Sequence, residues 1–308
     1  MVALVALVVP ASASSLPPQP GGVYPPPFVF AIWHESTRAS EIYTLEPRTG
    51  RRTVVVRSGS GALYPAAWRA STGRVYYVQD YSTSGEVMSV PVTGGTPRSE
   101  QVVLDRNSEF DVSPDGGTYL WTRMSDHGTF ETVSRPAGGA SSDVRVIADD
   151  GRFARFSPDG KRILFSRTIN KVGNTDSGDI AVYLMNADGS DIRRVTQFPP
   201  HDNTSGVVVA TNGRMSFSGG RVLYTYSTPS RAAWPNDLYA VEPSGANKRL
   251  VSRNAYNADW SSNNWLLYTK QDANNGNLYH AAVRSPGVPG REYVLTGAGY
   301  LAGLHFRS

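Results

Sequence analysis

The segment that decides the fold is Phe156-Ser157-Pro158-Asp159-Gly160-Lys161-Arg162-Ile163-Leu164-Phe165. Proline presets φ for a tight turn, and the Asp-Gly pair accepts the backbone angles that a short hairpin requires. Apolar residues on both sides give the two flanking strands a surface to bury. Alone, the segment predicts one β-hairpin.

The same turn recurs along the whole chain, at spacings of 43 to 46 residues except for one interval of 61 between Phe156 and Phe217. The copies are Trp68–Gly73, Val112–Gly116, Phe156–Gly160, Phe217–Gly220, Trp260–Asn264 and a last, incomplete one at Phe306–Ser308. Each full unit contains four short apolar strands, and no window has convincing helical periodicity. A period in the forties is typical of a four-stranded propeller blade.

The two ends of the array complement each other. The unit that starts at Phe28 lacks its first strand, whereas Leu301–Phe306 is a first strand with no successor. If the last strand completes the first blade, the ring closes and leaves no open sheet edge at the seam. We therefore predict an all-β, six-bladed β-propeller of four-stranded antiparallel blades over residues 28–308.

Composition narrows the function classes. The 308 residues fit one repeat domain, and the absence of cysteine excludes disulfides, thiolate metal sites and cysteine nucleophiles. The net charge is +4, but the arginines are scattered and form no run typical of a nucleic-acid surface. We expect no nucleic-acid partner.

The N-terminal residues resemble a targeting signal. Met1–Val9 is a short apolar run, and Ala11-Ser12-Ala13 matches an A-x-A cleavage pattern. Residues 1–13 are therefore predicted to be a signal peptide, and the Pro/Gly/Ser-rich residues 14–27 a linker. No transmembrane segment is expected, and the protein should be secreted or periplasmic.

The repeats resemble the TolB-type propeller family, whose units have a Trp/Phe-Ser-Pro-Asp-Gly turn, an Ile-Tyr strand with Asp-Gly, and Arg-Arg-Leu-Thr. The matching residues in one unit are Phe156–Gly160, Val182-Tyr183, Asp188-Gly189 and Arg193–Thr196. The resemblance covers residues 28–308 and implies the fold. TolB has an α/β domain before its propeller, and related serine peptidases have a hydrolase domain beside theirs. We expect neither domain in this sequence, so neither TolB's partners nor peptidase catalysis is carried over.

Sequence motifs for catalysis are absent. The chain has no G-x-S-x-G, H-E-x-x-H or Walker pattern. The turn chemistry accounts for Asp115 and Asp159, whose carboxylates are expected to accept backbone N–H groups. We expect no catalytic residue and no cofactor.

A polar row is expected to line the central channel. Side chains alternate along a strand, so the residue before each motif aromatic should face the channel when that aromatic packs between blades. Besides Ala67, this row contains Asp111, Arg155, Ser216, Asp259 and His305. These groups are expected to neutralise one another around water; the alternative is a hard cation held by Asp111, Asp259 and His305.

A second set lies upstream on the same strands, where the channel should open. It consists of Tyr64, Glu109, Arg152, Arg214, Tyr256 and Asn257. Tyrosine and arginine anchor ligands at low entropic cost, so this mouth is the predicted binding site. The alternative is ordinary packing for the tyrosines and a solvated rim for the charges.

The prediction for function is an extracytoplasmic, monomeric binding module that docks a protein, peptide or envelope glycan at the channel mouth. The alternative is a propeller enzyme, a hydrolase or lyase acting on sugars or lactones. Against it, the five histidines fall at different strand phases and form no cluster. A purely structural propeller is the third reading.

Overall fold

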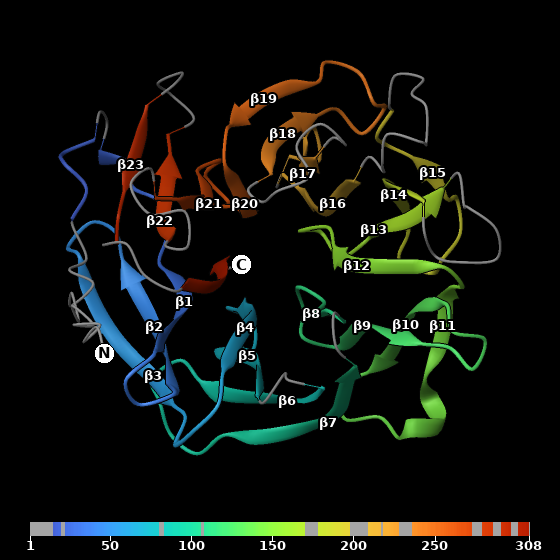
Figure 1. The fold of residues 1–308 in the computed structure, drawn as a ribbon, viewed down its shortest axis with the longest axis horizontal. Helices are drawn as coiled ribbons and strands as arrows, with labels where there is room; N and C mark the ends of the chain where they lie inside the picture. The colour runs from blue at the N-terminus through green and yellow to red at the C-terminus, as the bar shows by residue number, and fades with distance from the viewer. Residues whose placement is uncertain are drawn as a thin grey trace, which may run out of the picture.

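The structure is a computed structural model that describes residues 15–19, 22–79, 83–105, 108–169, 178–197, 209–216, 218–227, 236–272, 279–285, 291–296 and 301–307. Within these ranges every regular element is a β-strand except the 3-10 turn Ser141–Asp143. None of the described helices is long and apolar enough to cross a membrane. Figure 1 shows the strands arranged as sheets around a central axis, which confirms the all-β, propeller-like prediction.

Four of the sheets have four strands each. The first has the order β24-β1-β2-β3, formed by Leu301–Phe306, Phe28–His34, Ala39–Glu46 and Arg51–Arg57. The second contains β4 (Leu63–Arg69), β5 (Arg74–Gln79), β6 (Ser84–Pro91) and β7 (Arg98–Asp105). The third contains β8 (Phe110–Val112), β9 (Thr118–Met124), β10 (Phe130–Pro136) and β11 (Arg145–Ala148). The last contains β20 (Ala255–Trp260), β21 (Leu266–Gln271), β22 (Tyr279–Arg284) and β23 (Glu292–Val294).

The remaining sheet has eight strands, which differs from the prediction of six separate sheets. Its first half is β12 (Gly151–Phe156), β13 (Arg162–Ile169), β14 (Asp179–Asn186) and β15 (Arg193–Arg194). Its second half is β16 (Val209–Met215), β17 (Val222–Ser227), β18 (Asp237–Val241) and β19 (Arg249–Ser252). The halves are joined by one parallel pair, Ile180 with Val209, so a single contact merges two four-stranded units.

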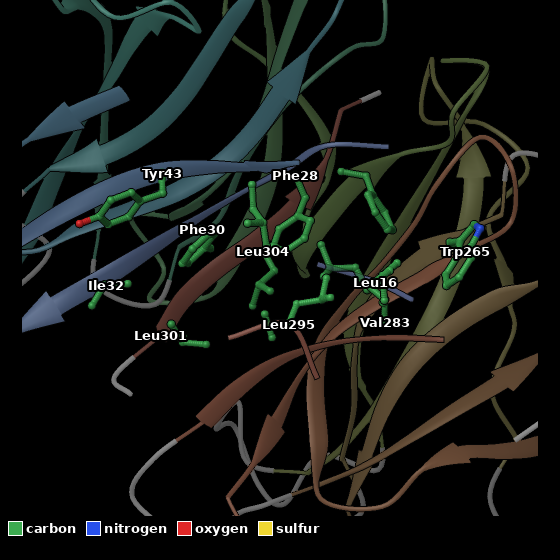
Figure 2. Close-up of a cluster of buried hydrophobic side chains, with 14 residues drawn as sticks. Leu16, Phe28, Phe30, Ile32, Tyr43, Trp265, Val283, Leu295, Leu301 and Leu304 are labelled. Carbon is green, nitrogen blue, oxygen red and sulfur yellow. The ribbon is translucent and has the colours of Figure 1, made fainter. Parts of the chain in front are cut away.

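The C-terminal strand closes the ring as predicted. β24 pairs antiparallel with β1, placing Phe306 opposite Phe28 and Leu301 opposite Ile32. Figure 2 shows the buried cluster at this seam, where side chains of β1 and β24 meet those of the last sheet. The cluster includes Trp265, and every one of its members is at most 8% exposed. The closure is therefore packed as a core rather than as a surface contact.

The described part of the predicted linker packs against this seam. Leu16 is buried in the same cluster, and its backbone N–H donates to the Pro47 carbonyl at 2.9 Å. Asn263 donates to the Tyr24 carbonyl at 2.7 Å. These residues form no strand, but they bind the first and last sheets and do not act as a free tether. The predicted signal peptide lies outside the described residues.

The Ser-Pro-Asp-Gly hairpins use their polar side chains internally. The Ser157 hydroxyl donates to Asp159 at 2.5 Å and accepts the Arg162 N–H at 2.9 Å. Gly160 has φ 70°, a left-handed angle that favours glycine. In the equivalent hairpin, bonds from the Ser113 hydroxyl and the Gly117 N–H lower the pKa of Asp115. The predicted structural role of both aspartates is confirmed.

Candidate functional site

A bulge interrupts each of several inner strands just before its motif residue. On β12, Arg152 pairs with Ser166 but Arg155 pairs with Leu164, so β12 has one extra residue there. The same irregularity falls between Pro65 and Ala67 on β4, between Thr211 and Arg214 on β16, and between Tyr256 and Asp259 on β20. Because a bulge resets the alternation of side chains, residues upstream of it do not follow the phase that simple alternation predicts.

The inner row itself lies around the axis. In Figure 1 the inner strands β4, β8, β12, β16 and β20 surround the centre, near which the C-terminus lies. Four polar residues of the predicted row are buried: Asp111, Arg155, Ser216 and His305. The row also contains a residue that the sequence analysis had put at the mouth, Arg214, whose side chain is 15% exposed.

The two aspartates of the row tie neighbouring inner strands together. Asp111 on β8 accepts the backbone N–H of Phe156 on β12 at 2.9 Å, and Asp259 on β20 accepts that of Phe306 on β24 at 2.9 Å. The other oxygen of Asp111 pairs with Arg69 of β4 at 2.6 Å. Each of these carboxylates thus bonds the motif residue of the next inner strand and links the strands around the channel. We call the row and the residues bonded to it the belt.

Arg155 and His305 extend this belt. Arg155 donates to the Phe110 carbonyl and pairs with Glu109 at 2.6 Å. His305 Nε2 lies 3.2 Å from the Pro65 carbonyl, so this nitrogen carries the proton. Burial, followed by the charges of three arginines, holds the pKa of His305 well below its ordinary value, so the ring is neutral at pH 7.

One junction of the belt differs from the others. Between β12 and β16 the row presents two arginines, Arg155 and Arg214, and no side-chain bond between these two residues is found in the described part of the chain. Arg214 makes no hydrogen bond there and has one ion pair, with Asp259 at 3.9 Å. Burial, and next the positive charge of Arg155, lowers the pKa of Arg214 to about 10. The guanidinium of Arg214 thus lacks a close acceptor.

A cavity of about 240 Å³ opens at the end of the channel where the inner strands begin. Four of the six predicted mouth residues line it: Tyr64, Glu109, Arg214 and Asn257. Arg155 and His305 of the inner row line it as well. At the hairpin end the channel narrows to a cavity of about 60 Å³, lined in part by Pro114 and Pro158. Of these two cavities, the one at the mouth end is about four times larger.

Two predicted mouth residues do not line this cavity. Arg152 hydrogen-bonds Thr168 and lies over the ring of Phe130 at 4.8 Å. Tyr256 packs edge-on against Tyr279 at 5.2 Å. Both lie upstream of the bulge of their strand, as does Tyr64, which lines the cavity. The bulge residue Asn257, at φ 48°, lines the cavity instead.

Ser216 was predicted to line the channel, and this is wrong. Its N–H donates to the Arg221 carbonyl at 2.8 Å, as that of Ser157 does to Arg162. Ser216 is therefore the hairpin serine of its unit, and Arg214 takes the channel position. The spacing from Ser216 to Arg221 matches that from Ser157 to Arg162, a signal that the search for an aromatic residue missed. Phe217, taken as the motif aromatic, lies outside the described residues.

Arg69 is a belt residue that the sequence analysis missed. It follows Trp68 at the position of the hairpin serine and donates to the Val112 carbonyl at 2.6 Å as well as pairing with Asp111. The departure from serine at this repeat, which Arg307 shares, was the available signal.

The alternative of a cation between Asp111, Asp259 and His305 does not fit the donor set. Both oxygens of each carboxylate already accept N–H groups or face an arginine. Among the described residues, no group of three or more His, Cys, Asp and Glu side chains could hold a metal ion. We therefore derive no chemistry through a metal at this site.

Comparison with known proteins supports the fold. No family model and no curated protein matches the sequence. TolB from Acinetobacter baumannii superposes with a TM-score of 0.71 at 14% identity, over 91% of this chain and 66% of that one, so this chain spans slightly less than two thirds of that protein.

Two other solved structures have the same fold. A chain of a nidogen/laminin complex gives a TM-score of 0.64 at 13% identity, covering 92% of this chain and 98% of that chain. An oligogalacturonate lyase in complex with manganese gives 0.51 at 12% identity, covering 86% and 77%. At these identities the likeness concerns architecture alone. The chain has the fold of a TolB-like β-propeller.

Proposed function

We propose that this protein is a binding module that holds an anionic group of its partner at the channel mouth, between Arg155 and Arg214. The observation that carries the proposal is the junction between β12 and β16, where Arg155 and Arg214 both line a cavity of about 240 Å³ and the guanidinium of Arg214 has no close acceptor among the described residues. The partner is a protein, peptide or envelope glycan. Arg214 is the anchor, Asn257 and Tyr64 supply polar and aromatic contacts, and Glu109 orients Arg155.

The electrostatics favour an anion over a cation at this point. A buried guanidinium that lacks a close acceptor loses hydration without full compensation. A carboxylate or phosphate placed between two guanidinium groups would accept charge-assisted hydrogen bonds from both. The lowered pKa of Arg214, about 10, has burial and the charge of Arg155 as its main causes. An anion in the cavity would remove that unfavourable interaction.

The proposal also covers the number of blades, export from the cytoplasm and the oligomeric state. We infer that the eight-stranded sheet is two blades in contact, because one residue pair joins two complete four-stranded halves; the ring would then have six blades. Export is inferred from residues 1–13, and a monomer from the closed ring. Under this proposal the propeller presents its mouth to partners outside the cytoplasm.

The test begins with partner capture from cell-envelope extract, using the mature protein and the Arg214→Gln variant side by side. For a captured partner, Arg214→Gln is expected to weaken binding by about 1–3 kcal/mol, roughly 5- to 150-fold. Arg152→Gln is the matched control, because Arg152 is an arginine on an inner strand that does not line the cavity. Equal losses from both variants, or none from Arg214→Gln, would contradict the proposal.

A propeller enzyme acting on acidic sugars is the second candidate, supported by the similarity to oligogalacturonate lyase. The same arginine pair would bind a sugar carboxylate in either case. Incubation of the purified protein with oligogalacturonate separates the two: unsaturated sugar products favour the enzyme, and binding without turnover favours the module.

A further inference from the structure

A second hollow lies away from the channel mouth, between the second half of the eight-stranded sheet and the last sheet. Its volume is about 410 Å³, larger than the mouth cavity, and the two share no lining residue. The lining residues are Ser216, Ser218, Arg221, Arg249, Leu250, Val251, Trp260, Asn264, Leu266, Arg284 and Ser285. We call this hollow the outer groove.

The outer groove is lined by charge of one sign. Arg221, Arg249 and Arg284 contribute to its lining, and none of the described lining residues is acidic. Arg249 is exposed. The ion pair of Arg221 is long, 3.8 Å to Glu242, and is of the surface type that contributes little. Three guanidinium groups around one groove therefore favour an anionic ligand.

Two buried N–H donors that belong to lining residues lack acceptors. The indole Nε1 of Trp260 has no hydrogen-bond partner within the described part of the chain, although Trp260 is only 7% exposed. The Nε of Arg284 is likewise buried and unpaired there. An unmade hydrogen bond of a buried donor costs about 1–3 kcal/mol. Both donors therefore add to the positive character of the groove lining.

The floor of the groove is apolar, and one wall is a sheet edge. Leu250, 41% exposed, and the buried Val251 and Leu266 provide apolar surface. Arg249, Leu250 and Val251 are consecutive on β19, which pairs only with β18 among the described strands and so forms the sheet edge. An edge strand beside a groove can add an extended peptide, which gains main-chain bonds at the edge and side-chain contacts in the hollow.

We propose that the outer groove binds an extended peptide segment in which acidic side chains alternate with apolar ones. The carboxylates pair with Arg249, Arg284 and Arg221, and the apolar side chains cover Leu250 and Leu266. A small inorganic anion would satisfy the arginines but would leave the apolar floor and the edge strand uncovered. The proposal is independent of the mouth site.

The test uses a six-residue peptide of alternating Glu and Leu, acetylated and amidated so that only side chains carry charge. Fluorescence anisotropy of the labelled peptide gives Kd for the protein and its variants. Arg249→Gln and Arg284→Gln are each expected to weaken binding about fivefold or more, and added salt should weaken it further. Arg145→Gln is the matched control, since Arg145 is an exposed arginine on the edge strand β11, beside the exposed Val146.

Position is tested by cross-linking. The chain has no cysteine, so Leu250→Cys carries a single photo-reactive maleimide label at the groove, and Val146→Cys carries it on the control edge. Peptide cross-linked through position 250 and not through 146 is the expected result. A second peptide, in which Gln replaces each Glu, should bind more weakly; equal binding of the two peptides overturns the proposal. Equal cross-linking at both positions overturns it as well, and so does displacement of the peptide by millimolar phosphate alone. Peptide binding lost with Arg214→Gln but kept with Arg249→Gln would move the site to the mouth and also overturn it.

Discussion

The two junctions on either side of β12 are built from the same positions but differ in bonding. Toward β8, Asp111 accepts the Phe156 N–H and Arg155 donates to the Phe110 carbonyl. Toward β16, Arg155 meets Arg214, and the described residues contain no bond between the two. The first junction is held by its own side chains, whereas the second leaves a positive gap that opens into the mouth cavity.

The difference shows how a repeat can carry both stability and function. An aspartate at the row position accepts a backbone N–H of the next strand, so that carboxylate oxygen is not available to a ligand. An arginine at the same position of β16 has no such backbone partner, so its donors are left for a ligand. Arg155, at the same row position of β12, donates to the Phe110 carbonyl, so the two arginines of the row differ in whether they bond a neighbouring strand. Substitutions at the bonded junctions should therefore reduce stability more than a substitution at the junction between β12 and β16.

Removing the closing strand should have the largest effect. Deletion of residues 300–308 would remove β24, its pairing with β1, the Asp259–Phe306 bond and the His305–Pro65 contact. It would also expose the apolar seam of Figure 2. The expected loss is several kcal/mol, comparable to the total stability of a domain, so the variant should be unfolded or aggregated. Circular dichroism and thermal melting check this, and an unchanged melting temperature would contradict the closure.

Breaking the bonded junction at a single residue should come next. Asp111 is 3% exposed, and Asp111→Ala would leave the half-buried Arg69 without its carboxylate and the Phe156 N–H without its acceptor. Removing one partner of a buried ion pair costs about 3–5 kcal/mol. Urea unfolding measures the loss. Asp126→Ala, at an exposed aspartate of a nearby loop, should change stability by less than about 0.5 kcal/mol.

Sequence reasoning found the ring, its closure and most of the belt, because these follow from the repeat period and from strand alternation. Of the residues predicted to line the channel, Asp111, Asp259 and His305 line the cavity at the hairpin end, and Arg155 lines the mouth cavity. It failed for Arg152 and Tyr256, which do not line the mouth cavity although Tyr64, at the same distance from its motif residue, does. The bulges on these strands are set by local backbone geometry that residue types alone do not reveal.

The misplacement of Ser216 has a different cause. Searching for an aromatic residue selected Phe217, although the conserved geometry of the turn depends on a serine that bonds the residue five positions on. The hydrogen bond of the serine, rather than a preceding aromatic residue, is what the Ser157 and Ser216 hairpins share. The outer groove was also invisible in the sequence, because its three arginines come from three separate strands or turns.

The belt also predicts how stability depends on pH. The folded pKa of His305 is below its ordinary value of 6.5, so on acidification the unfolded chain takes up this proton first. Stability should therefore fall as pH drops below about 6.5, with a slope from this group of at most about 1.4 kcal/mol per pH unit. His305→Gln keeps a donor for the Pro65 carbonyl and should flatten this part of the curve. His127→Gln, at an exposed histidine, should leave the pH dependence of stability unchanged. Urea unfolding of both variants between about pH 5 and pH 8, on either side of the ordinary histidine pKa, measures the effect.

The smallest change in stability is expected at the open junction. Arg214→Gln removes a guanidinium whose single ion pair, with Asp259, is 3.9 Å long, and it also removes the repulsion from Arg155. Asp259 keeps its two backbone donors, Trp260 and Phe306. The opposing terms should leave the free energy of unfolding at pH 7 within about 1 kcal/mol of the parent value, far less than for Asp111→Ala. Because the charge of Arg214 is the largest cause after burial of the lowered pKa of His305, the substitution should also raise the His305 pKa, which NMR titration can follow. A loss as large as that of Asp111→Ala would mean that Arg214 holds the ring together as the aspartates do, and the contrast between the two junctions would disappear.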